Sequence, residues 1–484
     1  MNYRAVTKVT NYVVGLMGLF LLLPAMIGVI YKEYHVALIY LAVAGGCLFV
    51  YTLFWHFLRK EPKRSRGFYG KEGFVVTALS WIIMSLIGAL PMCIAKDIPH
   101  YIDAVFEVAS GLSTTGASVI PDLDVVSHAT IFFRSFTHWI GGMGVLVFIL
   151  AILPRVSGSP LSILKAESPG PTVSKLVPKI QTTSLILYGL YIGLTVLEFV
   201  LLLFDKDLPL FVNICHTMGT AGTGGFSVTN SGQAGMSQYT QIITTIFMLL
   251  FGANFSFYFL LFSGKIKDAL KIEELRWYFC IWFIAVSVIL ANLFFSGYGF
   301  KENILGAAFS CASLMTTTGY TIVDFGQWPV FTHVVLMTLM FVGGCAGSTG
   351  GGFKVSRIML MIKQIGREIR QQIHPNQVYT VRVDKKPVSQ DVLKSCNTLF
   401  IAYVLILIVS CLIVSLDNFD FTTTFAGVMA TYNNIGVGFG KVCVGGCFNI
   451  FSDSSKIVMI IDMLAGRLEI LPMLILFHPN TWKK

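Results

Sequence analysis

Long apolar stretches recur along the whole chain, and short polar or basic segments separate them. A helix of about 20 apolar residues spans the roughly 30 Å hydrocarbon core of a bilayer. The pattern therefore predicts an all-α polytopic membrane protein. We expect its membrane helices near residues 12–30, 36–58, 74–94, 130–153, 182–203, 242–262, 277–295, 330–343, 399–416 and 457–476.

Shorter apolar segments lie between the paired stretches, at residues 101–113, 210–220, 303–316 and 421–432. They are too short to cross a bilayer, so we expect half-helices that enter the membrane and turn back. Asp103 and Glu107 fall in the first turns of the first segment, where acidic groups complement the helix dipole. Its C-terminal, negative end would then point toward a cation in the membrane. The alternative is a buried loop helix with no ion behind it.

Each short segment leads into a loop with a polar residue two positions before a glycine, at intervals of roughly 100 residues. Glycine permits the backbone angles that turn carbonyl groups inward, and such carbonyls replace the water shell of a dehydrated cation. We therefore predict a cation filter, for K⁺ by the family resemblance given below, built from four loops around one pore. Its residues are Thr114, Thr115, Gly116, Thr223, Gly224, Gly225, Thr317, Thr318, Gly319, Asn434, Ile435 and Gly436.

These units predict four parallel repeats of helix, re-entrant pore loop and helix, preceded by two extra N-terminal membrane helices. The predicted divisions are 1–72 for the N-terminal helices and their basic loop, then 73–179, 180–274, 275–392 and 393–484 for the four repeats. The third repeat includes a Gly-rich intramembrane loop and a cytoplasmic segment.

Composition and charge support a membrane protein and set its orientation. The chain is 55% hydrophobic and 12% charged, against roughly 25% charged in soluble proteins. The net charge of +10 comes from basic residues in loops 59–72, 155–179, 264–276 and 354–394, which is typical of cytoplasmic loops and not of nucleic-acid binding. Both termini are then cytoplasmic, and all four loops enter from the outer side. The first apolar stretch is too long for a signal peptide.

The cytoplasmic stretch 354–394 opens with a basic amphipathic segment, FKVSRIMLMIKQIGREIRQQIHP. Either it lies on anionic membrane lipid or it is a docking surface for a cytoplasmic partner. The following VYTVRVDKKPVS alternates apolar and polar residues around a turn, which favours a hairpin.

The sequence gives no sign of enzyme chemistry. No His, Cys or carboxylate cluster has metal-ligand spacing, and the ten cysteines lie mostly in apolar segments. Cys443 and Cys447 flank a short glycine-containing loop, 444–446, and would pair only if that loop faced an oxidising compartment. We therefore expect no enzyme and no structural zinc.

The segment GGCAGSTGGG at 343–352 interrupts the second apolar stretch of the third repeat. Phe353 stands where a phosphate-binding loop needs lysine, so the segment is not a nucleotide site. A rigid helix does not run through so much glycine, and we expect unwound backbone beside protein or a water-filled cavity. Simple close helix packing is the alternative.

Arg467 lies inside the last apolar stretch, where an arginine costs roughly 2.5–3.5 kcal/mol to insert. Carbonyl groups of the Gly-rich segment are suitable acceptors for its N–H groups, and Asp462 or Glu469 are alternative partners. Arg134 lies near the outer end of its stretch, which favours an interfacial position; His138 lies one turn further on.

The half-helix and Thr-Thr-Gly pattern resembles the superfamily of potassium transporters that includes TrkH, KtrB and plant HKT proteins. FRSFTHWIGGMGVLVFILAILP at 133–154 and AGRLEILPMLILFHPNTW at 465–482 resemble the TrkH family closely. The likeness covers almost the whole chain. Asn434 and Ile435 depart from the Thr-Thr-Gly pattern, so the four-fold symmetry is only approximate.

The resemblance implies K⁺ uptake across a bacterial inner membrane, by a subunit that dimerises and works with a cytoplasmic nucleotide-binding ring of the TrkA type. It also implies that the Gly-rich segment is an intramembrane gate, with Arg467 near the pore below the filter. The gate residues are Gly343, Gly344, Gly347, Gly350, Gly351, Gly352 and Arg467. A secondary symporter coupled to Na⁺ or H⁺ is the alternative, and the sequence leaves the coupling open.

Overall fold

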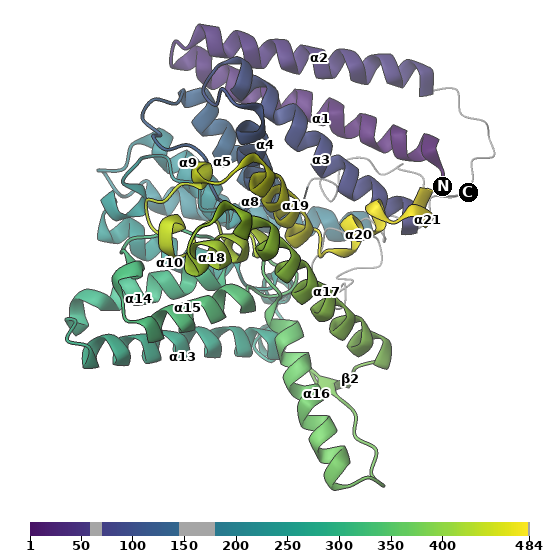
Figure 1. The fold of residues 1–484 in the computed structure, drawn as a ribbon, viewed down its shortest axis with the longest axis vertical. Helices are drawn as coiled ribbons and strands as arrows, with labels where there is room; N and C mark the ends of the chain where they lie inside the picture. The colour runs from purple at the N-terminus through teal and green to yellow at the C-terminus, as the bar shows by residue number, and fades with distance from the viewer. Residues whose placement is uncertain (59–69, 145–179, 483–484) are drawn as a thin grey trace.

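The described residues of the computed structural model, 1–58, 70–144 and 180–482, form a helical protein with a single two-stranded hairpin (Figure 1). Six helices in this part are long and apolar enough to cross a membrane, or seven if one bent pair is counted. This confirms the predicted all-α membrane protein. The six are α1 (Tyr3–Ile30), α2 (Tyr34–Leu58), α3 (Gly70–Ile94), α8 (Ile180–Leu202), α13 (Glu273–Phe295) and α17 (Gln390–Val414).

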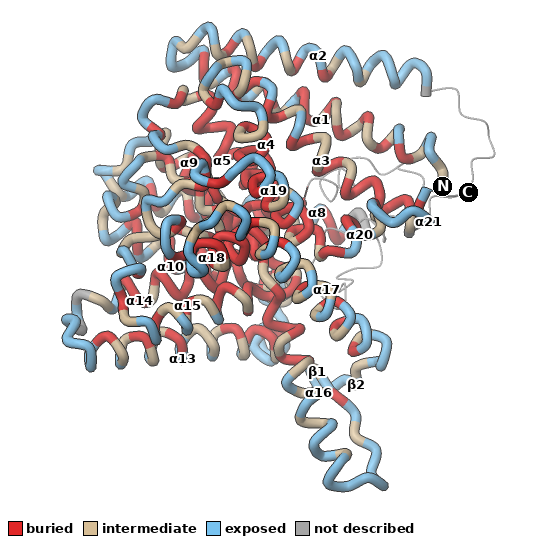
Figure 2. Tube along the Cα trace, viewed as in Figure 1, coloured by how far each residue is buried: buried red, intermediate tan, exposed pale blue. Residues whose placement is uncertain are grey.

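The four short helices form within a few residues of the predicted ranges. They are α4 (Tyr101–Leu112), α9 (Leu210–Gly222), α14 (Phe300–Met315) and α18 (Phe421–Tyr432). Buried residues gather in the middle of the molecule around α18 (Figure 2). A half-helix surrounded by protein satisfies its backbone ends without exposing them to lipid.

The second helix ends earlier than predicted in the first, second and fourth repeats, and within one residue of the prediction in the third. These helices are α5 (His128–Met143), α10 (Gln238–Phe251), α15 (Val330–Val342) and α19 (Asp453–Arg467). In the last three repeats a break follows, and the chain continues as α11 (Phe255–Phe262), α16 (Val355–Ile373) or α20 (Leu471–Phe477). In the first repeat, the predicted range beyond residue 144 lies outside the described residues.

Continuous spans over 242–262 and 457–476 were therefore wrong. Helices α10 and α11 meet at 91° because the chain turns at Gly252, whose close neighbours leave no room for a Cβ, and Asn254 caps α11. Helices α19 and α20 are separated by Glu469 and Ile470, both in the left-handed region with φ of 58° and 67°. Such backbone cannot continue a helix.

A second repeated feature ties the first helix of a repeat to the second. An aspartate after the first helix accepts a hydrogen bond from the serine that caps the second: Asp97 from Ser127 Oγ (2.5 Å), Asp205 from Ser237 Oγ, and Asp417 from Ser452 N (2.9 Å). A serine N-cap satisfies a free N–H of the first helical turn. The first, second and fourth repeats therefore share this link between their two membrane helices, as well as their pore loop.

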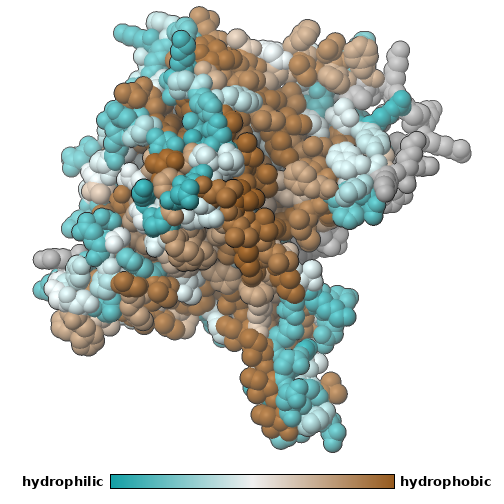
Figure 3. All heavy atoms as spheres, in the orientation of Figure 1, coloured by the Kyte–Doolittle hydropathy of each residue, from teal (hydrophilic) through white to brown (hydrophobic). Residues whose placement is uncertain are grey.

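The extra helices α1 and α2 pack on the first repeat, with α2 outermost (Figure 1). The two ends of the described chain lie together, where Tyr3 Oη donates to Trp482 O at 2.8 Å and the two rings stack. Figure 3 shows apolar side chains over the middle of one face, with hydrophilic ones toward both sides.

Helix α16 projects from the body and is followed by the hairpin of β1 (Arg382–Val383) and β2 (Lys386–Pro387) (Figure 1). The antiparallel pairing confirms the predicted hairpin, with Asp384 and Lys385 at positive φ in its turn. One side of α16 exposes Ile362, Ile365, Ile369 and Ile373. The remaining short helices are α12 (Ile266–Ala269) and α21 (Pro479–Trp482).

Candidate ion-selectivity filter and gate

The four predicted filter loops have the same backbone conformation. The residue two positions before each glycine is left-handed: Thr114 (φ 56°), Thr223 (52°), Thr317 (60°) and Asn434 (56°). Each glycine also has positive φ, between 75° and 81°. This region is uncommon for residues other than glycine, and threonine is β-branched and strongly disfavoured there. Four occurrences at matching positions indicate one structural unit used four times.

The same hydrogen bond holds each loop against its own half-helix. The residue just before the glycine donates its N–H to the carbonyl five positions earlier, at 2.8–2.9 Å in every loop. The four pairs are Thr115 to Ser110, Gly224 to Gly219, Thr318 to Ser313 and Ile435 to Ala430. The bond anchors the loop to the last turn of the half-helix, at the negative end of its dipole.

The loops form a closed ring in chain order. A Cβ placed on Gly116 would lie 1.9 Å from Gly224 O, one on Gly225 1.9 Å from Thr318 O, and one on Gly319 1.9 Å from Ile435 O. A Cβ on Gly436 would lie 2.3 Å from Thr115 O, which returns the ring to the first loop. Each glycine therefore rests against a carbonyl of the next loop, and no other residue fits there.

Only the glycines of this ring are partly exposed. Gly116, Gly225, Gly319 and Gly436 are each half-buried, whereas the two residues before each of them are buried. This is the pattern of four glycines that face one narrow opening.

Asn434 departs from threonine yet strengthens the ring. Its Nδ2 donates to Thr115 Oγ1 at 3.0 Å and to Met463 O at 2.8 Å. The amide thus joins the fourth loop to the first loop and to α19. A threonine side chain is one atom shorter and has a single donor, so it could not make both bonds.

A buried ion pair supports the chain just beyond the first filter loop, and the sequence interpretation missed it. Arg134 on α5 is 2% exposed, and its Nε donates to Glu107 Oε1 at 2.7 Å. Glu107 also accepts from Ser118 Oγ and from Val119 N, both at 2.9 Å, just beyond Gly116. The expected interfacial position of Arg134 was therefore wrong, because Glu107 compensates its charge inside the protein. The sequence does carry a signal for such a pair: an acidic residue in one apolar segment of the repeat and a basic residue in the next.

Arg134 also reaches the second loop. Its guanidinium lies 4.1 Å from the centre of the Phe226 ring, and Nη1 donates to Ser227 O at 3.3 Å. His138 bridges the same two repeats: Nδ1 lies 2.9 Å from Gly111 O, and Nε2 accepts from Phe226 N at 3.2 Å. With one nitrogen accepting, the other must carry the proton, so the imidazole is neutral.

The Gly-rich segment 343–352, called the Gly-rich loop below, is not helical and lies directly against the filter. Gly351 N donates to Thr317 Oγ1 at 2.6 Å. A Cβ on Gly351 would lie 2.5 Å from Asn433 O, and one on Gly350 would lie 2.9 Å from Thr316 O. The loop therefore touches the third and fourth filter loops at the ends of their half-helices.

Hydrogen bonds attach the Gly-rich loop to the break between α10 and α11. Cys345 N donates to Gly252 O at 2.9 Å, and Phe255 N donates to Gly347 O at 3.0 Å. Ala346 N donates to Glu274 Oε1 at 2.6 Å. The expectation of unwound backbone beside protein is met, and the loop is well bonded on that side.

Arg467, the last residue of α19, connects three repeats. Its Nη1 donates to Thr349 O in the Gly-rich loop at 2.6 Å, and its Nη2 donates to Gly141 O and Gly142 O of α5 at 2.5 and 2.6 Å. The alternative partners bind elsewhere: Asp462 accepts from Ser410 Oγ at 2.8 Å, and Glu469 pairs with Arg357 at 2.6 Å.

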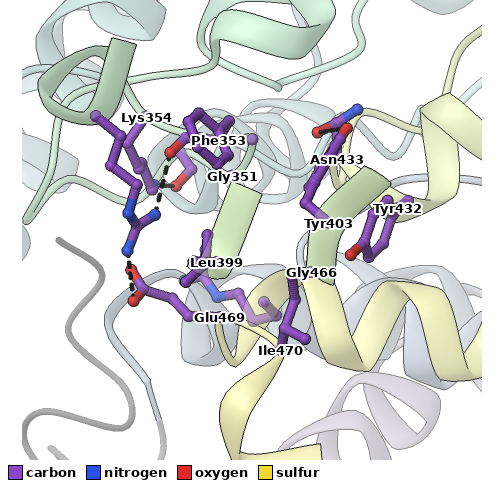
Figure 4. A pocket seen from close by; sticks show the side chains of 14 residues that line it. Gly351, Phe353, Lys354, Leu399, Tyr403, Tyr432, Asn433, Gly466, Glu469 and Ile470 are labelled. Atoms are coloured by element: carbon purple, nitrogen blue, oxygen red, sulfur yellow. Dashed lines mark hydrogen bonds and ion pairs between the residues drawn. The ribbon is translucent and has the colours of Figure 1, made fainter. Parts of the chain in front are cut away.

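A small cavity of about 20 Å³ lies among the Gly-rich loop, α17 and the end of α19, and it has room for roughly one water molecule. Figure 4 shows Tyr403 beside Asn433 on one side of the cavity and Glu469 on the other, where Glu469 pairs with Arg357. Lys354, which the sequence interpretation did not single out, donates from Nζ to Gly350 O. Three buried basic side chains, Lys354, Arg357 and Arg467, therefore surround the inner side of the loop.

Cys443 and Cys447 are not joined in a disulfide. Cys447 Sγ lies 3.3 Å from Ser118 O instead. Among the residues that the structure describes, the only group of three metal-ligating side chains is His100, Asp103 and Asp453 at the outer surface. Asp103 there is already paired with Lys456 at 2.6 Å.

Comparisons with known proteins identify the family of the chain. The family model TrkH, described as a cation transport protein, matches residues 47–484. The Trk system potassium uptake proteins TrkH of Salmonella typhimurium and of Escherichia coli K12 are each 34% identical over the full length of both chains. The crystal structure of the potassium transporter TrkH from Vibrio parahaemolyticus superposes with a TM-score of 0.87 at 32% identity, covering both chains completely. The chain belongs to the TrkH family of cation transport proteins.

Proposed function

We propose that this protein takes up K⁺ across a bacterial inner membrane through the ring of four filter loops. The observation that carries the proposal is the closure of the ring, in which each filter glycine meets a carbonyl of the next loop. The choice of K⁺ as the ion is supported by its relatives, which are named as potassium uptake proteins. The protein is then a transporter and not an enzyme.

The chemistry of the ring suits a large monovalent cation. Carbonyl oxygens that surround an opening replace the hydration shell of K⁺ without adding a full negative charge. The carbonyls of Thr115, Gly224, Thr318 and Ile435 lie against the neighbouring glycines, and each filter loop is bonded to the C-terminal, negative end of its half-helix. One shared glycine per loop gives fewer carbonyl rings than the TVGYG filter of K⁺ channels.

The Gly-rich loop is proposed as the gate below this filter. It touches Thr317 and Asn433 from the inner side and is held there by Arg467 and Lys354. Its glycines permit rearrangement, and the surrounding positive charge opposes cations while the loop is closed.

Partners and orientation are part of the same proposal. We infer cytoplasmic N- and C-termini from the basic loops, and the two ends lie together. Helix α16 and the following hairpin project from the body, so they are suited to receive a cytoplasmic nucleotide-binding ring of the TrkA type. A homodimer surrounded by membrane lipid completes the assembly.

Uptake of ⁸⁶Rb⁺ into proteoliposomes of the purified protein tests this function. K⁺ and Rb⁺ should compete with the tracer, and Na⁺ and Li⁺ should compete weakly. Equal competition by Na⁺ and K⁺ would reject a K⁺ filter, and uptake of organic substrates driven by Na⁺ would favour a carrier.

A further inference from the structure

Glu198 is a buried acidic side chain that the filter and gate do not use. It is 0% exposed and lies on α8, a helix that otherwise faces largely outward with Val196, Leu197 and Val200 exposed. Among the described residues no basic side chain pairs with it, and the hydroxyl of Thr220 is the polar group beside its carboxyl oxygens. An acidic group at membrane depth is rare and by default points to function.

The carboxyl lies beside Thr220 of α9 and near Tyr320, which follows the third filter loop. The neighbouring polar group is the Thr220 hydroxyl, which already donates to His216 O at 3.1 Å. Thr220 O accepts from the N–H of filter residue Thr223 at 2.9 Å. Tyr320, which directly follows Gly319, donates its hydroxyl to the same His216 carbonyl at 3.3 Å. Thr220, the residue beside Glu198, is therefore hydrogen-bonded directly to the second filter loop.

Among the described residues, the basic side chains on the elements packed against α8 lie on α5 and are bound to other groups: Arg134 pairs with Glu107, His128 pairs with Glu33, and His138 lies between Gly111 O and Phe226 N. The other described titratable groups there are Tyr188 and Tyr191 on α8, Cys215 and His216 on α9, Tyr239 on α10, Tyr258 on α11 and Tyr320 in the third filter loop. His216 is fixed between Thr244 Oγ1 (2.8 Å) and Gln233 Nε2 (2.6 Å), and because the Gln233 amide donates, the imidazole accepts there and is neutral. The carboxylate would therefore be uncompensated if it ionised without a cation nearby.

An unpaired charge in such surroundings is costly, and the group avoids the cost by holding a proton. A K⁺ ion in the adjoining filter favours the ionised carboxylate over the protonated carboxyl, because opposite charges attract strongly across a medium of low dielectric constant. We propose that Glu198 is a proton-binding site coupled to K⁺ occupancy of the filter: the carboxyl holds a proton when the filter is empty and releases it when K⁺ binds.

Coupling of this kind is reciprocal. If K⁺ binding releases a proton, then a lower pH must weaken K⁺ binding, because protonation removes the negative charge near the filter. The inference rests on the proposed function, since it needs K⁺ in the filter, and it adds a second ligand, the proton.

Proton release by the purified full-length protein in weakly buffered detergent tests the coupling, with a pH-indicator dye and additions of KCl or NaCl. Wild-type protein should release on the order of one proton per chain with KCl and far less with NaCl. Glu198→Gln should lose this release and still melt at a higher temperature in KCl than in NaCl. The matched control Asp462→Asn, a buried carboxyl bonded to Ser410, should release as wild type does.

Infrared difference spectra of wild-type protein between KCl and NaCl give a readout that needs no variant. They should show loss of a protonated-carboxyl band on K⁺ binding. An unchanged band, or equal release by Glu198→Gln and wild type, would overturn the proton site while KCl still stabilises the protein. If KCl and NaCl stabilise wild-type protein equally, the K⁺ filter itself is rejected, and the coupling with it.

Discussion

Arg467 Nη1 lies 2.6 Å from the carbonyl oxygen of Thr349, so the end of α19 is tied directly to the Gly-rich loop. The same guanidinium binds two carbonyls at the end of α5. Hydrogen bonds from a charged donor contribute roughly 1.5–3 kcal/mol each. One side chain therefore fixes the loop relative to the first and fourth repeats.

Arg467→Ala should raise K⁺ flux several-fold, because it removes both the tether on Thr349 and a positive charge below the filter. Tracer uptake per protein in proteoliposomes measures the change. Arg467→Lys separates the two effects, since it keeps the charge but cannot reach three carbonyls in the fixed fork geometry of arginine. If Arg467→Ala only lowers the yield of folded protein, its role is structural.

Deletion of several residues within 344–351 should raise flux as well, because it removes backbone that touches Thr317 and Asn433. It should also lower the melting temperature, because the loop is bonded to the α10–α11 break. Combined with Arg467→Ala, the deletion should add little further flux. Effects that multiply would mean that arginine and loop act independently.

Gly319→Ser should reduce discrimination between K⁺ and Na⁺. Glycine at φ 80° rests against Ile435 O, so an added side chain must push the two loops apart. Gly193→Ser on α8 is the matched control, because a Cβ there meets nothing within 4 Å. Ion competition in tracer uptake gives the comparison; unchanged selectivity in serine variants of all four filter glycines would count against the ring.

Glu107→Gln should destabilise the protein by about 3–5 kcal/mol, because it leaves Arg134 as an uncompensated buried charge. Its melting temperature in detergent should fall clearly. Glu368→Gln removes a carboxylate that pairs with Arg367 at the surface and should change stability by less than about 1 kcal/mol. Equal melting of the two variants would show that the buried pair contributes no more than a surface one.

The fold class, the half-helices and the four loop positions could be predicted from sequence, because hydrophobic length and a repeated glycine are local signals. Helix α18 begins at Phe421 and ends at Tyr432, as predicted. An acceptor for Arg467 in the Gly-rich loop could also be predicted, since unwound backbone supplies free carbonyls.

The breaks in the second helices could not be predicted. Ile457–Leu476 was predicted as one membrane span, and the left-handed turn at Glu469 and Ile470 has no local sequence signal because neither residue favours it. The Arg134–Glu107 pair joins α5 to α4, and the Arg467 bonds to Gly141 and Gly142 join α19 to α5, so both depend on how separate helices pack.

The reversal potential of the purified protein in a planar bilayer tests the central claim, that the four loops form one K⁺-selective filter. KCl on one side and NaCl on the other at equal concentration impose opposed gradients. The ring predicts a reversal potential far toward the equilibrium potential of K⁺, which moves toward zero in Gly319→Ser and stays unchanged in Gly193→Ser. A wild-type reversal potential at zero would contradict it.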